Sequence, residues 1–510
     1  MTNAVVEAVT GGGGTLVDLL LAGRPDAVAV RGPAGVLSHG DLDAASELLA
    51  RQLVGAGVAV GDRVAFQVRK STSVVVLHLA LLRCGAVQVP VNPDYPEPEA
   101  RGLLEDADPV LVVRDPGCPD VAGPWRTVTL DGSGQGSLTL LPSGSGPLPE
   151  VRATDGAAIL FTSGTTGRPK GALLTHDNLV ANARTLIEAW GFTESDHLAH
   201  ILPLFHTHGL FVALHCALGS GASLTLHPAF DVEAVVDTLV GSPRATVLMG
   251  VPTHYARLLD SPRFTADSLA HLRLLVSGSA PMTPALHEAV RRRTGLEVLE
   301  RYGMTETSIL TSNPLVGVRK AGSVGPPLPG VDVRVVPTDD GGDGGVGAVE
   351  VRGRTVFSGY WRRPELQREI FTSDGWFRTG DLGRRDDDGY LHLVGRSKDL
   401  VISGGMNVYP ADVEAVLDAI AGVRESAVVG LPDDDLGERV VAVVVLVADP
   451  RTDVLVPEKI RQACRGQLAG YQTPKQVVVM QQLPRNAMGK VDKNVLRETL
   501  SGTQGVMPGE

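Results

Sequence analysis

Short valine-rich runs alternate with helical segments along the first part of the chain. In residues 42–55 and 74–84, apolar side chains recur at helical spacing, which predicts helices with one buried face. The runs between them predict strands at residues 63–68, 87–91 and 109–113, because β-branched residues favour a pleated backbone. Strands separated by helices are typical of an α/β fold with largely parallel sheets.

The pattern changes twice later in the chain. Valine-rich runs flank a turn of glycine and aspartate at residues 339–345, which predicts a β-rich subdomain. Beyond residue 398 the order helix, strand, strand, helix, strand predicts a compact α+β domain, with its elements at residues 411–421, 425–431, 439–447, 457–468 and 475–480. We therefore expect an N-terminal domain at residues 1–397, a C-terminal domain at residues 398–500 and a tail at residues 501–510.

Composition and charge narrow the class of protein. Of the 510 residues, 43% are hydrophobic and 20% are charged, as in an ordinary globular protein. The net charge of −12 argues against broad binding to nucleic acid or to an anionic membrane, so any phosphate must be recognised locally. The four cysteines are far apart and show no metal-ligand spacing. Neither an N-terminal signal nor an apolar run long enough to span a bilayer is visible, and we expect a cytoplasmic protein without stable membrane insertion.

One loop carries the strongest chemical signal. The string Phe161-Thr-Ser-Gly-Thr-Thr-Gly-Arg-Pro-Lys-Gly171 places glycines, hydroxyl groups and two cations together after an apolar run. Backbone N–H groups and hydroxyls in such a loop can surround phosphate oxygens, and Arg168 and Lys170 supply positive charge. Pro169 stands where the common phosphate-binding loop requires glycine, and the dinucleotide fingerprint is absent. Composition alone also fits a plain surface turn, so it is the ordered string that predicts nucleotide binding.

This string, together with later segments in the same order, resembles the adenylate-forming superfamily of acyl-CoA synthetases, adenylation domains and luciferases. The later segments are residues 203–210, 277–307, 360–400 and 484–493. The chain is most similar to malonyl-CoA synthetases, over nearly its whole length. The resemblance implies that residues 1–397 form a large α/β adenylation domain with a β-rich subdomain. It also implies that the small α+β domain is mobile and rotates about Lys398 between two catalytic states.

The resemblance implies a site for ATP and magnesium. The loop would close over the β- and γ-phosphates, and Tyr302 would stack on adenine. Asp381 would accept hydrogen bonds from the ribose hydroxyls, with Arg396 beside it. Thr165 and Glu306 would hold Mg²⁺, a hard cation that prefers oxygen ligands. The residues implied for ATP binding are Thr162, Ser163, Gly164, Thr165, Thr166, Gly167, Lys170, Ser279, Ala280, Glu300, Arg301, Tyr302, Gly303, Met304, Thr305, Asp381 and Arg396.

Lys490, near the end of the chain, resembles the family's catalytic lysine. Its charge would bridge the substrate carboxylate and the α-phosphate in the transition state, rather than act as a base. Acetylation by a lysine acetyltransferase would remove that charge. His206 is the second catalytic candidate, either as a general base or, as the resemblance favours, as a gate between the acyl pocket and the thiol tunnel. Coenzyme A, the cosubstrate, would approach Gly404 and Gly405 after the small domain rotates.

The class of acid substrate is predicted from one positively charged side chain, that of Arg301. A dicarboxylate needs a positive partner for the carboxylate that does not react, because burying that charge unpaired is costly. The forked guanidinium of Arg301 is the candidate; alternatively, it would pair with a protein carboxylate and only support the pocket wall. Ile309 and Leu310 depart from the polar residues usual in malonyl-CoA synthetases, which favours a substituted malonate or a different acid. The predicted substrate-binding residues are His206, Thr207, Ser277, Arg301, Met304 and Ile309.

The sequence therefore predicts an ATP-dependent carboxylate–CoA ligase for malonate or a substituted malonate. A ligase for short- or medium-chain monocarboxylates is the first alternative. The second is an enzyme that adenylates an acid and loads it onto a carrier protein, but no acidic residue that would pair with an α-amino group is found in residues 205–210 or 277–281. The third is a non-catalytic nucleotide-binding regulator, against which the presence of the implied catalytic and metal-binding residues argues.

Overall fold

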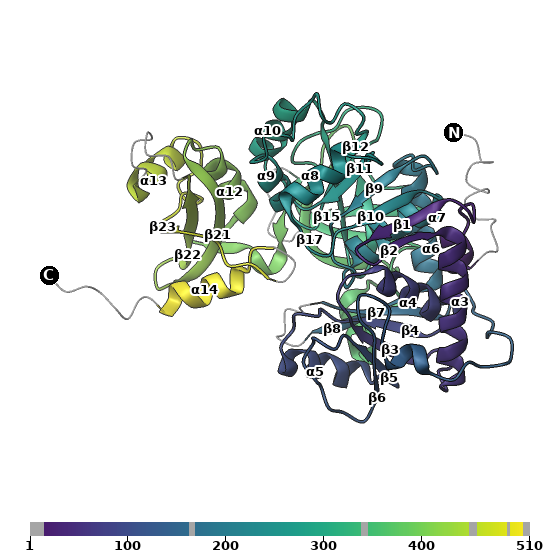
Figure 1. The fold of residues 1–510 in the computed structure, drawn as a ribbon. Coiled ribbons are helices and arrows are strands. Elements are labelled where there is room, and N and C mark those ends of the chain that lie inside the picture. The colour runs from purple at the N-terminus through teal and green to yellow at the C-terminus, as the bar shows by residue number, and fades with distance from the viewer. Residues whose placement is uncertain (1–14, 163–168, 338–344, 448–455, 487–489, 503–510) are drawn as a thin grey trace.

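The computed structural model describes residues 15–162, 169–337, 345–447, 456–486 and 490–502. Two large sheets, a smaller antiparallel sheet and a C-terminal sheet make up this part of the chain (Figure 1). In Figure 1 the C-terminal sheet and its helices stand to one side of the rest. The predicted fold class, a large α/β part with a β-rich subdomain and a small α+β C-terminal part, is confirmed. Within the described residues, no helix combines the length and apolar character needed to cross a membrane.

The first large sheet grows from the early valine-rich runs. The strands predicted at residues 63–68, 87–91 and 109–113 are found in it with small shifts at their ends. All neighbouring strands are parallel except the last pair. In spatial order the strands are β6 (Arg126–Thr129), β5 (Leu111–Arg114), β3 (Arg63–Gln67), β4 (Val87–Pro90), β7 (Gly156–Thr162) and β8 (Lys170–Thr175).

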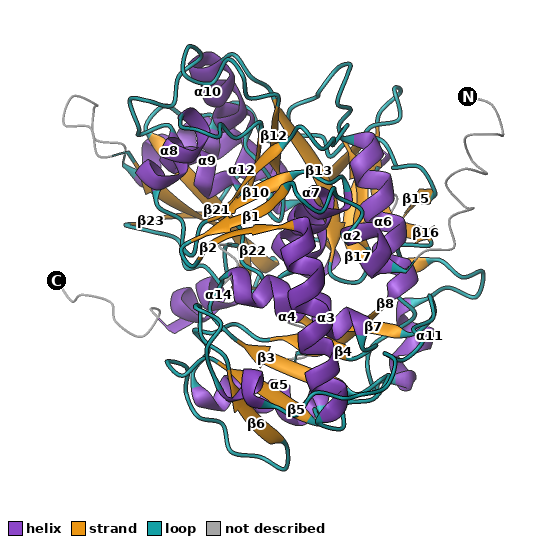
Figure 2. Cartoon of the chain, turned by 45° about the vertical axis from the view of Figure 1, so that its right-hand side comes forward, coloured by secondary structure: helices purple, strands orange, loops and turns teal. Residues whose placement is uncertain are grey.

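The second large sheet is parallel except at its two edges. In spatial order its strands are β14 (Ser308–Ser312), β13 (Val298–Met304), β12 (Leu274–Ser277), β11 (Val247–Gly250), β9 (His197–His200), β10 (Ser223–Leu226), β1 (Val28–Gly32) and β2 (Gly35–Ser38). One group of helices on this sheet is α8 (Val232–Val240), α9 (Pro252–Leu258) and α10 (Pro284–Thr294), and a separate pair is α6 (His176–Ala189) and α7 (Leu214–Gly219) (Figure 2).

Helix α4 (Thr72–Arg83) joins the two large sheets. Nearly every side chain along it is buried, as expected for a helix that is enclosed on all sides. It packs against β4 of one sheet, against β1 of the other, and along α3 (His39–Gly55), and both helices match the sequence prediction. His78 on α4 hydrogen-bonds Oε1 of Gln88 (2.8 Å) and Nε2 of His215 on α7 (3.0 Å). One hydrophobic core therefore runs through both sheets.

The predicted β-rich subdomain is an antiparallel sheet. In spatial order its strands are β15 (Val331–Pro337), β16 (Gly347–Gly353), β17 (Phe377–Arg385) and β18 (Leu391–Arg396). In the ladder between β17 and β18, Asp381 lies opposite Arg396. The register of this hairpin therefore places two predicted nucleotide-binding residues side by side.

The C-terminal part contains every element that its sequence predicts. These are α12 (Pro410–Asp418), β21 (Val423–Asp433), β22 (Gly437–Leu446), α13 (Pro457–Arg465) and β23 (Gln476–Met480). Three further elements were not predicted, namely β19 (Val401–Ser403), β20 (Met406–Val408) and α14 (Lys493–Gly502).

Helix α14 begins at Lys493, the last residue of the segment 484–493 that resembles the adenylate-forming superfamily. Leu496 and Leu500 bury one face of this helix in the same hydrophobic cluster as residues of β21. The helix continues through Ser501 and Gly502, the first two residues of the predicted tail. The rest of the tail lies outside the described residues, and the domain boundary at Lys398 stays a prediction.

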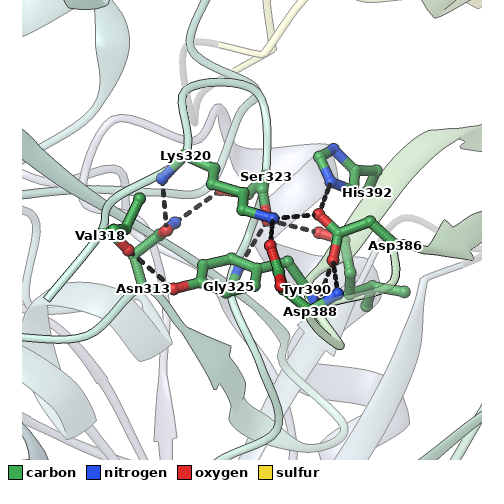
Figure 3. Close-up of polar contacts among 10 residues, drawn as sticks. Asn313, Val318, Lys320, Ser323, Gly325, Asp386, Asp388, Tyr390 and His392 are labelled. Atoms are coloured by element: carbon green, nitrogen blue, oxygen red, sulfur yellow. Dashed lines mark hydrogen bonds and ion pairs between the residues drawn. The ribbon is translucent and has the colours of Figure 1, made fainter.

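A buried asparagine fixes the loop that follows β14 (Figure 3). Nδ2 of Asn313 donates to the main-chain oxygens of Glu300 (3.1 Å) and Ser323 (2.7 Å), and its Oδ1 accepts the N–H of Lys320 (3.1 Å). The ammonium group of Lys320 lies 2.7 Å from each of two aspartates in the turn between β17 and β18. The network therefore ties the β-rich subdomain to the strand that carries Glu300.

We expect Asn313→Ala to lower the free energy of unfolding by about 3 kcal/mol, because it leaves buried main-chain groups without hydrogen-bond partners. The midpoint of thermal unfolding measures this change. Asn494→Ala, on the exposed side of α14, is the matched control and should change the free energy by less than about 0.5 kcal/mol. Equal midpoints for both variants would show that Asn313 does not hold the loop.

Candidate active site

Candidate site residues gather at the carboxyl ends of the parallel strands, the edge at which α/β sheets bind ligands. His206 follows β9, Ser277 ends β12, and Glu306 follows β13. Lys490 comes from the C-terminal part of the chain, and its ammonium group interacts electrostatically with Glu306 and Arg301 of the larger part. Segments that are distant in sequence therefore meet in one site.

Asp381 is held by two side chains. Its Oδ1 lies 2.9 Å from Nε of Arg396, and its Oδ2 accepts a hydrogen bond of 2.5 Å from the hydroxyl of Tyr302. Burial and the charge of Asp381 raise the pKa of Tyr302, which therefore stays protonated as a donor. Because each carboxylate oxygen has two lone pairs, Asp381 can still accept hydrogen bonds from ribose hydroxyls.

Glu306 is the centre of a second polar cluster. Its Oε1 accepts hydrogen bonds from the hydroxyls of Tyr360 (2.8 Å) and Thr162 (3.4 Å). The ammonium group of Lys170 lies 5.6 Å from the centre of the Tyr360 ring. The structure thus brings together three residues predicted for the phosphates and the metal. The other predicted loop residues lie outside the described part of the chain; they are Ser163, Gly164, Thr165, Thr166 and Gly167.

The surroundings of Glu306 fit a magnesium ion. Across the described residues, no group of three or more His, Cys, Asp or Glu side chains is arranged to hold a metal. Mg²⁺ does not need such a group, because it usually takes one or two carboxylates and completes its coordination with waters and substrate phosphates. A single buried carboxylate beside the hydroxyl of Thr162 matches that requirement.

Gly303, predicted to bind ATP, is required by the fold itself. It lies at an irregularity in the ladder between β13 and β14, where a Cβ would lie 2.0 Å from the carbonyl oxygen of Ser308. The absence of a side chain at Gly303 therefore allows β13 and β14 of this chain to approach each other closely. Met304 and Thr305, both partly buried, follow Gly303 and lead to Glu306.

Arg301 is a buried cation with unused hydrogen-bonding capacity. The residue is 5% exposed, and its Nε and Nη2 have no hydrogen-bond partner among the described residues. Gly278 lies directly against it, since a Cβ there would be 2.3 Å from Cζ of Arg301. Burial lowers the pKa of Arg301 to about 9. The alternative in which Arg301 pairs with a protein carboxylate therefore finds no support in the part of the chain that the structure describes.

More buried polar atoms in this region lack partners. Among the described residues, Nδ1 of His206, Oγ1 of Thr207, Nε2 of His208 and Oγ of Ser277 make no hydrogen bond. Both histidines interact electrostatically with Arg301. Buried polar groups are rarely left unpaired in a folded protein. These atoms therefore form a set of buried polar groups whose hydrogen bonds a ligand would complete.

The histidines of this pocket are neutral. Burial, together with the positive charges of Lys490 and Arg301, lowers the pKa of His206 to about 3. An imidazole with so low a pKa is a weak proton acceptor at neutral pH, which disfavours the role of general base.

Ser279, predicted to bind ATP, lies within hydrogen-bond distance of His208. Its Oγ lies 3.2 Å from Nδ1 of His208, and its φ of +67° is a left-handed conformation that residues other than glycine rarely adopt. Strained residues of this kind gather at functional sites. Ala280, which is also predicted to bind ATP, follows Ser279 and is partly buried.

Two predicted site residues are held by the protein itself. The carboxylate of Glu300 accepts the N–H of Gly322 (3.2 Å), and burial raises the pKa of Glu300 to about 7. Ile309 belongs to the hydrophobic core, and its carbonyl oxygen accepts a hydrogen bond from Nδ2 of Asn182 (3.0 Å). Their predicted roles, in ATP binding and substrate binding, stay predictions.

The predicted hinge and the predicted coenzyme A contacts lie at the surface. Lys398 is exposed in the short turn η5 (Ser397–Asp399), and the neighbouring Asp399 pairs with Arg497 of α14 at 2.8 Å. Gly404 and Gly405 form the exposed turn between β19 and β20, with φ of +60° and +77°, which favours glycine. A Cβ on Gly405 would meet no atom within 4 Å.

Sequence reasoning missed two residues of the site, Tyr360 and His208. Tyr360 was only the first residue of a matching segment, and nothing in the sequence connects it to Glu306, which lies 54 residues earlier. His208 begins the π-helical turn η2 (His208–Ala213), a structure that is frequent at functional sites but has no clear sequence pattern. The only available signal was the spacing of two histidines around Thr207.

Comparisons with known proteins agree with this geometry. Residues 20–361 match the AMP-binding enzyme family, and residues 412–490 match the AMP-binding enzyme C-terminal domain. The chain belongs to the AMP-binding enzyme family, which confirms the predicted resemblance to adenylate-forming enzymes. The mitochondrial malonate–CoA ligase of Mus musculus is 36% identical, and the alignment covers 89% of this chain and 85% of that protein.

Solved structures give the same result at the level of the fold. ATP-bound MatB from Rhodopseudomonas palustris is 45% identical and superposes with a TM-score of 0.89, covering 96% of this chain and 99% of that one. Apo MatB from the same organism, also 45% identical and with the same coverage, gives a TM-score of 0.80. The arrangement described here is therefore closer to the ATP-bound form than to the apo form.

The charge of Lys490 predicts how activity changes with pH. Burial and the nearby charge of Arg396 lower the pKa of Lys490 to about 8. Since only the protonated amine carries the charge, we expect kcat/KM for ATP to fall as the pH rises through about 8. Pyrophosphate release measured against pH tests this. Lys490→Arg, whose guanidinium stays protonated, should show no such fall. A wild-type profile that stays flat well above that pH would contradict the assignment.

Proposed function

We propose that this chain is an ATP-dependent carboxylate–CoA ligase that acts on malonate or a substituted malonate. In the first half-reaction, a carboxylate oxygen of the acid attacks the α-phosphorus of ATP and pyrophosphate leaves. In the second, the thiol of coenzyme A attacks the acyl carbon of the acyl-AMP and AMP leaves. The mouse relative is named a malonate–CoA ligase, which supports the same acid for this chain.

One observation carries the choice of a dicarboxylate, and it is the buried guanidinium of Arg301 without an anionic partner. Malonate would bring one carboxylate to Arg301 and leave the other for the α-phosphorus. The fork of the guanidinium matches a carboxylate, so the same contact would satisfy Nε and Nη2. A monocarboxylate of similar length would leave the cation buried and unpaired, which is unfavourable by several kcal/mol.

The polar atoms around Arg301 suit the same ligand. His206 and His208 stay neutral because their pKa values are lowered by burial, so they do not add to the positive charge of the pocket. Neutral imidazole and hydroxyl groups can donate hydrogen bonds to a carboxylate. Thr207 and Ser277 would contribute such hydroxyls, and His206 would separate the acyl pocket from the path of the thiol.

The nucleotide would lie between the two carboxylates of the site. Asp381 would receive the ribose hydroxyls, and the ring of Tyr302 would contact adenine. Glu306 and Lys170 would face the phosphates, with Thr165 as a second ligand of the metal. Magnesium, when bound, supplies positive charge that offsets the charge of the phosphates.

Lys490 would stabilise the transition state of the first half-reaction. Its ammonium group already interacts with the charges of Arg396, Asp381 and Arg301, which supports a position between the nucleotide and the acid. The higher TM-score with ATP-bound MatB supports an arrangement suited to adenylation. The second half-reaction would need a rotation about Lys398 that withdraws Lys490 and brings the turn at Gly404 toward the thiol. A cytoplasmic location and control by acetylation of Lys490 stay predictions that the sequence alone makes.

The first test compares acids with and without the second carboxylate. We expect Arg301→Met to lower kcat/KM for malonate and methylmalonate by about a hundredfold or more, because truncating one partner of a buried charge pair is strongly unfavourable. The kcat/KM for propanoate and butanoate should change little. Pyrophosphate release with ATP and each acid measures the effect.

Arg319→Met is the control for this test. Arg319 is partly buried, whereas Arg301 is buried, and the guanidinium of Arg319 donates to main-chain oxygens, among them that of Leu315 at 3.0 Å. This variant should leave unchanged the ratio of kcat/KM for dicarboxylates to kcat/KM for monocarboxylates. Equal losses on both kinds of acid in Arg301→Met would remove the carboxylate role of Arg301. A wild-type preference for butanoate would favour the monocarboxylate alternative, and acyl-AMP formation without transfer to coenzyme A would favour a carrier protein.

The second test separates the half-reactions. Lys490→Ala should lower acyl-AMP formation by about a hundredfold or more, as expected when a group that stabilises transition-state charge is removed. Thioester formation from supplied malonyl-AMP and coenzyme A should keep the wild-type rate. Lys493→Ala, whose amine pairs with Glu414 at 2.7 Å within the C-terminal part, is the control and should leave adenylation intact. Equal loss of both half-reactions in Lys490→Ala would argue for a structural role.

A further inference from the structure

Tyr360 is fixed beside the strand that leaves the glycine-rich loop. Ala172 of β8 pairs with Tyr360 in an antiparallel bridge. The N–H of Leu173 donates to the carbonyl oxygen of Gly359 (3.3 Å), and the N–H of Trp361 donates to that of Gly171 (2.7 Å). Main-chain hydrogen bonds on both sides of Tyr360 therefore hold its Cα in register with β8.

This register places the ring of Tyr360 next to Lys170. Side chains two positions apart on a strand share a face, so Lys170 lies on the same side of β8 as Ala172, the partner of Tyr360. The ammonium group of Lys170 lies 5.6 Å from the ring centre, within the range of a cation–π interaction. Phe357 meets the ring edge-on, with centroids 5.0 Å apart and an interplanar angle of 79°. The ring is thus supported on one side and available to a cation on another.

The hydroxyl of Tyr360 contacts Glu306, the carboxylate predicted to hold Mg²⁺. It donates to Oε1 of Glu306 at 2.8 Å, and Thr162 approaches the same oxygen at 3.4 Å. Glu306 is buried. No hydrogen bond to its Oε2 is found within the described residues, so the phenol orients the carboxylate through one oxygen and leaves the other for a ligand.

We propose that Tyr360 is a positioning residue that couples the metal-binding carboxylate to the phosphate-binding lysine. Its hydroxyl orients Glu306 for Mg²⁺, and its ring guides the ammonium group of Lys170 toward the phosphates. This inference rests on the proposed function, because it assigns Glu306 and Lys170 to MgATP. A hydrogen bond and a ring contact carry the two effects, so two substitutions can separate them.

Tyr360→Phe removes the hydroxyl and keeps the ring. A hydrogen bond to a charged group is worth enough to change an equilibrium about tenfold or more. We expect the Mg²⁺ concentration at half-maximal pyrophosphate release to rise about tenfold by that measure. ATP binding measured by calorimetry should weaken by the same factor in Mg²⁺ and should be unchanged in EDTA. The calorimetric comparison does not depend on turnover.

Tyr360→Leu removes the ring as well. Since Lys170 then loses its aromatic neighbour, ATP should bind more weakly in EDTA too, by about threefold, as expected for a partly exposed cation–π contact. In both variants, thioester formation from supplied acyl-AMP should keep the wild-type rate, because that step involves neither group.

The chain offers a matched control in Tyr390. Its hydroxyl donates to the carbonyl oxygen of Val318 at 2.8 Å, and the ammonium group of Lys320 lies 4.4 Å from its ring centre (Figure 3). Tyr390→Phe therefore also removes a hydroxyl from a lysine–tyrosine pair, in the turn between β17 and β18, but the hydrogen bond that it breaks goes to a main-chain carbonyl rather than to a carboxylate. It should leave the Mg²⁺ requirement and both ATP affinities unchanged.

Each outcome of the experiment supports or overturns the proposal. A Tyr360→Phe variant with an unchanged Mg²⁺ requirement would overturn it. Equal weakening of ATP binding in Mg²⁺ and in EDTA would show a general structural effect and would also overturn it. If the wild type released no pyrophosphate with any acid, the proposed function would fail. The calorimetric arms would still test Tyr360, so the two failures are distinguishable.

Discussion

A buried guanidinium without an acidic partner is the constraint on which the rest of the site depends. Burying a lone charge is unfavourable by several kcal/mol, and the fold accepts this at Arg301. Gly278 gives the guanidinium its space, and the neighbouring histidines remain neutral under burial and its positive charge. An anionic group that enters the pocket would recover the lost stabilisation. In the proposed function, the acid would be selected by an interaction that the free protein lacks, so that the unfavourable burial of a lone charge in the empty site would contribute to affinity.

The two carboxylates at the nucleotide end follow one design. Asp381 is oriented by the phenol of Tyr302, and Glu306 by the phenol of Tyr360, each from a different segment of the chain. A phenol can fix the direction of a carboxylate without neutralising it, unlike a lysine or an arginine. Among the described residues Glu306 forms no ion pair, whereas Asp381 pairs with Arg396 and keeps acceptor capacity for hydroxyl groups.

Helices and strands with a clear local pattern could be predicted from the sequence, whereas contacts between residues far apart in the chain could not. The valine-rich strands of the first large sheet and the elements of the C-terminal part were predicted because each carries its signal within a few consecutive residues. The site residues were predicted by resemblance, since no local pattern distinguishes Asp381 or Lys490 from ordinary turn or surface residues. The contact between Tyr302 and Asp381 spans 79 residues, and it exists only after the β-rich sheet packs against the larger one. Strands as short as β19 and β20, on either side of two glycines, carry too few residues for a periodic signal.

The helix shared by the two large sheets has a consequence for alignment. The glycine-rich loop extends from β7 of one sheet, whereas Arg301 and the histidine pocket belong to the other. In the proposed function, the distance between a phosphate and an acid held by these two groups would depend on how α4 packs between the sheets, through contacts such as that of His78 with His215. A small shift of one sheet relative to the other would misalign the two reactants even if every residue that contacts them were unchanged. A displacement of about 1 Å can slow a reaction about a hundredfold. In the proposed function, the packing of the core would therefore set the distance between the two reactants, and a core substitution would lower the rate even where it left the stability unchanged.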